Sequence, residues 1–172
     1  MSRLGLLPLG FGDTIVLLTA VHFHFAGFAA PLIASLAGER IGHSSNLLRF
    51  ATITMILAAL AVALGITLFP WLELIAALWL SIGMMALSSV LLRDVRKCLT
   101  TRPSRILITI AAVSVWPSMA LASAFAIGEF LERGPLDIPL MSATHGWLNG
   151  MGFAICGLLS FRRPLLTSVK PA

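Results

Sequence analysis

The sequence predicts an all-α membrane protein in which five transmembrane helices form one bundle, with residues 1–172 as a single domain. Two features of the composition favour this class: 58% of the residues are hydrophobic and 11% are charged, whereas soluble domains carry about 25% charged residues. The third observation is a pattern, because the apolar residues occur in five long runs with basic residues in the gaps between them. So few polar side chains cannot cover a water-soluble protein, and a lipid bilayer is the expected solvent.

Each of the five runs is long enough for a spanning helix, which needs roughly 20 apolar residues at about 1.5 Å per residue. They cover approximately residues 14–35, 50–69, 71–92, 106–127 and 140–161. The first is interpreted as a helix and not as a cleaved signal peptide, because it contains polar side chains and exceeds the usual apolar core of a signal. Pro70 separates the second and third runs and predicts a tight antiparallel hairpin. Pro117 lies inside the fourth run and predicts a kink, because proline lacks the N–H of a helical hydrogen bond.

Lysine and arginine predict the orientation of the bundle, because the loops that keep them usually lie in the cytoplasm. Ten of the twelve basic residues follow the first, third and fifth helices: Arg40, Arg49, Arg93, Arg96, Lys97, Arg102, Arg105, Arg162, Arg163 and Lys170. We therefore expect the N-terminus outside, the C-terminus in the cytoplasm, and a multi-pass protein of the bacterial inner membrane. Basic residues confined to short loops also argue against nucleic acid as a partner, since that would need a continuous basic face.

Three histidines and one asparagine lie inside the apolar runs. His22 and His24 are expected about 12–15 Å into the first helix, and His145 about 6–8 Å into the fifth, with Asn149 one turn deeper. Ionisable groups are costly inside a bilayer and usually face the bundle interior, so these four residues are candidates for a catalytic site. Two residues along a helix correspond to about 200° of rotation, so His22 and His24 cannot share a face. Which of the two faces the interior stays open at this point.

Carboxylates collect at the outer ends of the predicted helices. Glu73 and Glu129 border the third and fourth apolar runs, and Asp13 precedes the first. Asp13 points in nearly the same direction as His24, because eleven residues correspond to about 1100° of rotation. Acids and histidines in the same half of the bundle are typical of an acid–base site, in which the acids would set the protonation of the imidazoles. We therefore include Asp13, Glu73 and Glu129 among the candidate catalytic residues.

Small residues mark the fifth helix, where Gly146 and Gly150 form a GxxxG pair. Such a pair allows close approach of helices, either within the chain beside His145 or between two copies of it in a homo-oligomer. The two cysteines, Cys98 and Cys156, have no paired spacing that would predict a disulfide framework or a metal centre. We expect no cofactor and no bound metal.

Two segments resemble the signatures of a known family. The run from His22 to Phe28 reads HFHFAGF, and the run from Ala143 to Phe153 reads ATHGWLNGMGF. Both are similar to segments of the YndJ-like bacterial membrane proteins. The resemblance covers the first and fifth helices, and it places His22, His24, His145 and Asn149 inside the family's motifs. It implies an integral membrane protein and does not imply a reaction mechanism.

The clustering of acids and histidines favours a membrane-embedded enzyme that moves protons on a small lipophilic substrate. An isomerase, a cyclase or an epoxide-opening enzyme of a biosynthetic route would fit, because histidine can act as acid or base near neutral pH. Two alternatives remain open. One is a non-enzymatic role as a small membrane subunit, transporter or assembly factor, and the other is a haem or metal-binding protein with imidazole ligands. The sequence lacks the GxSxG, GxxxxGK and GxGxxG motifs of soluble hydrolases, P-loop proteins and dinucleotide-binding enzymes.

Overall fold

A computed structural model describes residues 17, 20–21, 24–42, 45–134 and 136–162 of the chain. Within these residues the regular structure is helical and no strand occurs. Three helices are long and apolar enough to cross a membrane: Asn46–Leu68, Pro70–Cys98 and Arg102–Phe130. The prediction of an all-α protein with several helices able to span a bilayer is confirmed.

The first helix of the bundle includes the π-helical η3 (Phe25–Ala29), which is followed by α2 (Ala30–Ile41). It ends at Gly42, whose φ of 73° is the left-handed conformation that glycine adopts with little strain. The predicted end near residue 35 was therefore too early. The segment beyond it contains the charged residues Glu39 and Arg40, and these continue the helix until this glycine.

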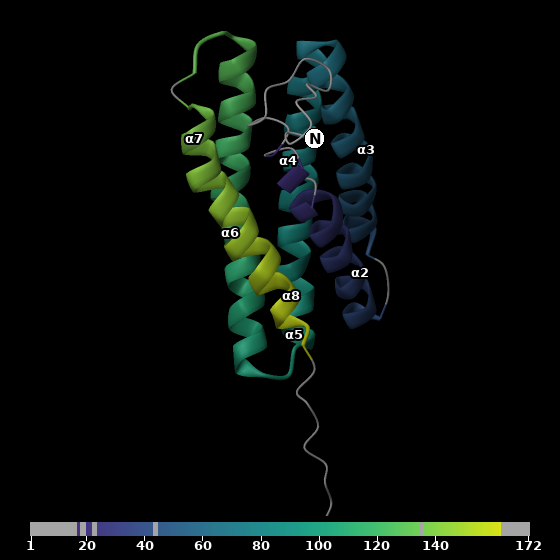
Figure 1. Ribbon diagram of the computed structural model, residues 1–172. Coiled ribbons are helices and arrows are strands. Elements are labelled where there is room, and N and C mark those ends of the chain that lie inside the picture. Colours follow the sequence, from purple (N-terminus) through teal and green to yellow (C-terminus); the bar gives the residue numbers. More distant parts are fainter. Residues whose placement is uncertain (1–16, 18–19, 22–23, 43–44, 135, 163–172) are drawn as a thin grey trace, which may run out of the picture.

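A hairpin of two long helices comes next. α3 (Asn46–Leu68) starts at Ser45, whose hydroxyl accepts a hydrogen bond of 3.1 Å from the backbone N–H of Leu48. α4 (Pro70–Val90) follows after a single residue, and Pro70 occupies its first turn, where the missing N–H is not needed. The two helices pack against each other (Figure 1), so the predicted hairpin at Pro70 is confirmed.

The chain remains helical beyond α4 through η4 (Leu91–Val95) and α5 (Arg96–Cys98), and then turns into α6 (Arg102–Phe130). Both helices are longer than the apolar runs 71–92 and 106–127 that predicted them, because their basic ends are also helical. The Thr101 hydroxyl starts α6 by accepting a 3.3 Å hydrogen bond from the N–H of Ser104. α6 continues through Pro117 and packs against α4.

The last helical segment, which we call the C-terminal helix, is a continuous run over residues 138–160. It consists of α7 (Ile138–Met141), the π-helical η5 (Ser142–Gly146) and η6 (Leu148–Ile155), and α8 (Cys156–Ser160). Asp137 begins it, because its carboxylate accepts a 2.8 Å hydrogen bond from the N–H of Leu140. The segment crosses α6 obliquely and contacts it along η5, η6 and α8 (Figure 1).

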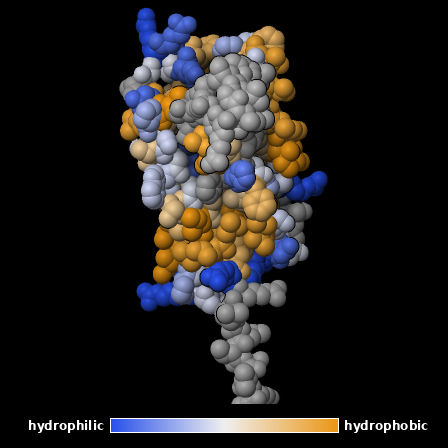
Figure 2. All heavy atoms as spheres, in the orientation of Figure 1, coloured by the Kyte–Doolittle hydropathy of each residue, from blue (hydrophilic) through white to orange (hydrophobic). Residues whose placement is uncertain are grey.

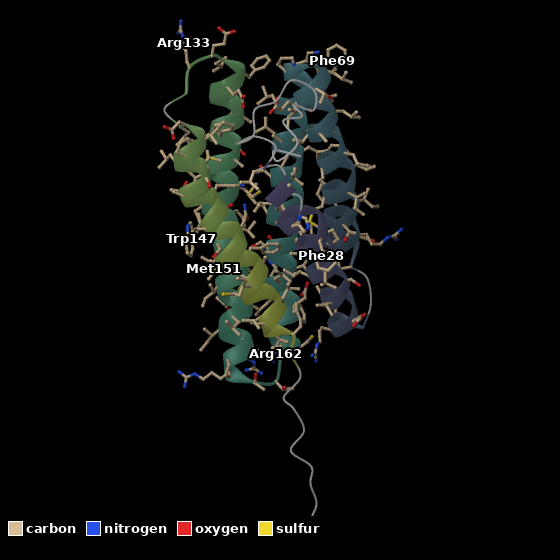
Figure 3. All side chains as sticks on the ribbon, in the orientation of Figure 1. Phe28, Phe69, Arg133, Trp147, Met151 and Arg162 are labelled. Carbon is tan, nitrogen blue, oxygen red and sulfur yellow. The ribbon has the colours of Figure 1, made fainter. Side chains whose placement is uncertain are left out.

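The apolar core lies where α2, α4, η4 and α6 meet. Its fully buried side chains include Ile33, Leu87, Leu91, Ile108 and Val115. The surface carries many large apolar side chains, and Figure 2 shows wide hydrophobic areas between hydrophilic groups near the two ends. Arg133 and Phe69 mark one end and Arg162 the other (Figure 3). An apolar surface between two polar ends is typical of a helical bundle in a bilayer.

Candidate functional site

A polar group joins α6 to the C-terminal helix through His145, Ser118 and Asn149, which we call the His145 cluster. The imidazole Nδ1 lies 2.9 Å from the carbonyl oxygen of Ser118 and 3.0 Å from its hydroxyl oxygen. The imidazole Nε2 lies 2.9 Å from the side-chain nitrogen of Asn149. Ser118 is fully buried, whereas His145 and Asn149 are half-buried. Both nitrogens of the ring are therefore held by named partners.

These contacts determine which ring nitrogen carries the proton. A carbonyl oxygen can only accept a hydrogen bond, so Nδ1 must donate its N–H to Ser118. In the neutral ring Nε2 is then the acceptor, and it receives the amide N–H of Asn149. Nδ1 cannot deprotonate the Ser118 hydroxyl in this arrangement, because it already carries a proton. The chemistry of the cluster therefore centres on the lone pair of Nε2.

Local structure places His145 and Asn149 on one side of the C-terminal helix, four residues apart. His145 lies in η5 and Asn149 in η6, and such π-helical turns occur frequently at functional sites. Close packing fixes this helix on α6. A side chain at Gly152 would collide with Ser114, since its Cβ would lie 2.7 Å from the Ser114 Cβ. The helices can approach this closely only because residue 152 has no side chain.

A second set of polar contacts connects α4 with α6 behind the His145 cluster. The Ser88 hydroxyl donates to the carbonyl of Ala112 at 2.7 Å and accepts from the Trp116 indole N–H at 3.0 Å. One turn beyond Ser118, the Ser123 hydroxyl donates to that of Ser81 at 3.2 Å. Hydropathy and residue spacing did not point to Ser118 or to these serines. Their only signal was a hydroxyl within an apolar helix, which more often bonds to its own helix, as Ser114 does with Ile110.

The first helix contributes a histidine at a similar height. His24, Ser118 and His145 all lie about 25 Å from the helix ends on the Arg162 side, at about 1.5 Å per residue. The segment that follows His24, η3, contacts η6. The His24 side chain is exposed, however, and its Nδ1 lies 2.8 Å from the carbonyl of Ala20 on its own helix. A chamber shared by the two imidazoles stays a prediction. His22 and Asp13 lie outside the described residues.

The two remaining acids do not join the His145 cluster in the structure. Glu73 is half-buried in the first turn of α4, and Glu129 is exposed near the end of α6, close enough for their negative charges to repel each other. Glu129 lies about 16 Å along α6 from Ser118 at about 1.5 Å per residue, too far for direct contact with His145. Glu129 instead lines an open hollow with Arg133 and Asp137 at the turn before α7. The acids and His145 thus occupy different levels of the bundle.

The glycine pair of the fifth predicted helix is divided in the structure. Gly150 is buried within the chain, whereas Gly146 is exposed. A Cβ at Gly146 would have the carbonyl oxygen of Met141 as its nearest neighbour, at 3.9 Å. A homo-oligomer through Gly146 and Gly150 stays a prediction. In the part of the chain that the structure describes, no three histidine, cysteine or acidic side chains gather as metal ligands.

Comparisons with known proteins agree with the membrane character of the chain. A family model described as YndJ-like protein matches residues 1–153. The uncharacterized membrane protein YndJ of Bacillus subtilis (strain 168) is 31% identical over 152 residues, which cover 88% of this chain and 27% of that protein. The chain thus spans about a quarter of the length of this relative. No solved structure matches the chain. The matched residues include the whole His145 cluster.

Proposed function

The chain belongs to the YndJ-like family, and from this premise and the geometry of the His145 cluster we propose that it is a membrane-embedded acid–base enzyme. It acts on a small lipophilic substrate, as an isomerase, a cyclase or an epoxide-opening enzyme does. His145 is the group that transfers the proton, and Asn149 orients the substrate. One observation carries the proposal: the imidazole Nδ1 is held by the Ser118 carbonyl, which leaves Nε2 to accept the hydrogen bond of Asn149.

We further propose that this enzyme crosses the inner membrane five times, with its N-terminus outside and its C-terminus in the cytoplasm. The distribution of basic residues supports this orientation, since ten of twelve lie at or beyond the expected cytoplasmic ends of the helices. The opposite positions of Arg133 and Arg162 support a C-terminal helix that extends from one end of the bundle to the other (Figure 3). In this orientation the hollow beside Glu129 opens to the outer side of the membrane, and the His145 cluster lies inside the bundle at the depth of the lipid bilayer.

The geometry of the cluster suits proton transfer in three ways. The hydrogen bond from Nδ1 to Ser118 fixes the ring and becomes stronger when Nε2 takes up a proton, because the donor is then charged. The Asn149 amide can serve either state, since turning it by about 180° presents its oxygen instead of its nitrogen to Nε2. Ser118 and Gly150 are buried, and helix packing around them limits the water that competes for the proton.

The direct test compares the lipids of bacterial membranes that contain the wild-type protein or the His145→Gln variant. Glutamine keeps a polar side chain but cannot act as a base, so we expect a lipid-soluble product that accumulates with the wild type to disappear with the variant. Ser89→Ala is the control, because this hydroxyl bonds at 2.9 Å to the Met85 carbonyl within α4 and not to the His145 cluster. Identical lipid extracts from wild type and His145→Gln, at equal amounts of folded protein, would refute the proposed activity.

A second role is favoured by one observation, the mutual hydrogen bonds of Ser118, His145 and Asn149, which resemble a structural contact between helices. The chain would then be a non-enzymatic membrane subunit, transporter or assembly factor. The His145 cluster would then only fasten the C-terminal helix to α6. In that case His145→Gln lowers the stability of the bundle and leaves the lipid extract unchanged.

A further inference from the structure

We propose that the His145 cluster recognises a neutral lipid-soluble alcohol or phenol, whose hydroxyl group binds between the imidazole Nε2 and the Asn149 amide. This inference rests on the proposed function and adds the substrate class. In the bound state the hydroxyl donates its proton to Nε2 and accepts the amide N–H of Asn149. A rotation of the Asn149 side chain opens the space, and the ligand then replaces the direct 2.9 Å contact between the two side chains.

The acceptor Nε2 of His145 and the donor amide of Asn149 together match the hydrogen-bonding groups of a hydroxyl. The acceptor is Nε2, because Nδ1 donates to Ser118, and the donor is the Asn149 amide. A hydroxyl satisfies both through one oxygen atom, since it donates once and accepts twice. An ether or a ketone has no proton to donate to Nε2, and inserting it would leave the nitrogen lone pair desolvated without a partner. A carboxylate also has no proton to donate.

The charge distribution along the two helices disfavours an ionic ligand at this level. The C-terminal helix has no Asp, Glu, Lys or Arg between Asp137 and Arg162, and α6 has none between Arg105 and Glu129. Apart from the imidazole of His145, neither helix offers a counter-ion for a charged ligand here, and an unbalanced charge is unfavourable within an apolar bundle. We therefore assign a neutral ligand to the neutral form of the ring.

The surrounding surface suits a ligand whose remaining part is apolar. Trp147 and Met151 project from the C-terminal helix and are 64% and 48% exposed (Figure 3). Phe28, on the η3 segment that contacts η6, is 66% exposed. Trp147 and Met151 lie on one side of the C-terminal helix and Phe28 lies on the other (Figure 3), so a hydrocarbon chain that stays in the bilayer meets apolar side chains on either side of this helix. A long-chain or isoprenoid alcohol has this combination of one hydroxyl and an apolar body.

Photolabelling of the wild-type protein in vesicles of a neutral phospholipid tests the inference. The probe is a long-chain primary alcohol with a diazirine beside the hydroxyl end, and the matched control is its methyl ether. We expect the alcohol to label residues 138–160 and to be displaced by excess unlabelled alcohol. The ether should label this segment roughly fivefold less, because the lost hydrogen bond to Nε2 costs about 1 kcal/mol. Equal labelling by alcohol and ether would overturn the proposal.

Two variants locate the hydroxyl. His145→Leu removes the acceptor and should reduce labelling by the alcohol to the level of the ether, whereas Asn149→Leu removes a donor that either oxygen can use and should weaken labelling by both probes. Ser89→Ala is the control and should keep the preference for the alcohol, because this hydroxyl bonds at 2.9 Å to the Met85 carbonyl within α4. If His145→Leu is folded and retains the full preference for the alcohol, the proposed binding mode is wrong. The comparison of alcohol with ether needs no variant, so it stays informative if a substituted chain does not fold. Specific labelling together with unchanged lipid extracts would refute the enzymatic function and leave the binding site intact.

Discussion

Polar groups on both faces of α6 form hydrogen bonds inside the bundle, but their partners on the two faces differ in chemistry. Toward α4, the Ser88 hydroxyl both donates to Ala112 and accepts from Trp116, so its hydrogen bonds use groups that keep one protonation state. Toward the C-terminal helix, Ser118 meets an imidazole, which can take up a proton, and an amide that can serve either state. A polar contact inside lipid is therefore no sign of function by itself. The feature that indicates function is the imidazole of His145, which can gain or lose a proton while the Asn149 amide still offers it a matching hydrogen bond.

The largest expected effect separates the two faces by chemistry. His145→Gln should lower formation of the lipid-soluble product by about 100-fold or more, which is the usual contribution of a general acid or base. The matched change on the other face, Ser88→Ala, should leave product formation within about twofold, because Ser88 contacts no group that transfers a proton. Both rates are measured per amount of folded protein in membranes. Equal losses in the two variants would mean that the bundle as a whole, and not His145, limits the rate.

Gly152→Ala tests how closely the C-terminal helix must approach α6. The new methyl group would meet the Ser114 side chain, with the two Cβ atoms 2.7 Å apart, so the helices must separate. We expect the free energy of unfolding in mixed micelles to fall by about 1–3 kcal/mol, the usual cost of overpacking. Alcohol-specific photolabelling should weaken in parallel. A variant as stable as wild type would show that this contact does not fix the helix.

Ser88→Ala should have a smaller effect on stability. It removes the acceptor of the Trp116 indole N–H and the bond to Ala112, and polar contacts between membrane helices contribute about 1 kcal/mol. Ser89→Ala is the control, because that hydroxyl bonds at 2.9 Å to Met85 within its own helix. Unfolding in mixed micelles should therefore be easier for the Ser88 variant than for the Ser89 variant. The opposite order would remove the role assigned to the α4–α6 contacts.

Gly146→Ala should have the smallest effect. The nearest atom to its new methyl group would be the Met141 carbonyl oxygen at 3.9 Å, which is ordinary contact. We expect the free energy of unfolding to stay within about 0.5 kcal/mol of wild type when the chain is monomeric. The same sample, examined by size in detergent, tests the homo-oligomer predicted through Gly146. A loss of oligomers in this variant would show that the exposed glycine contacts a second copy.

Apolar run length was sufficient to predict the three described helices that are long and apolar enough to span a bilayer, because each backbone hydrogen bond must be made within a segment that crosses it. It was a poor guide to helix ends. The first helix continues past position 35, through Glu39 and Arg40, up to Gly42, and α6 begins at Arg102, ahead of its apolar run. The hydroxyls of Ser45 and Thr101 cap the first turns of α3 and α6 and thereby set where these helices begin. Such capping depends on single hydroxyl groups, which a hydropathy pattern does not reveal.

The candidate site was predictable in part. The cost of an imidazole in lipid pointed to His145, and helical spacing added Asn149. Ser118 was missed because its important atom is a backbone carbonyl, whose position depends on how α6 packs and not on the residue type. The role predicted for Glu73 and Glu129 relied on their shared half of the bundle. That prediction did not take into account the distance along the helix. Glu129 lies about 16 Å beyond Ser118 at about 1.5 Å per residue, which is too far to reach His145.

The central claim concerns the protonation of one ring, and nitrogen NMR of the protein in lipid bilayers tests it directly. A sample labelled with ¹⁵N in histidine and asparagine gives the state of each nitrogen, and a His145→Gln sample assigns the signals. We predict that Nδ1 of His145 is protonated and that Nε2 is an unprotonated acceptor close to the Asn149 amide. A neutral ring with its proton on Nε2 would contradict the account, because Nε2 could then neither accept a hydroxyl proton nor act as the base.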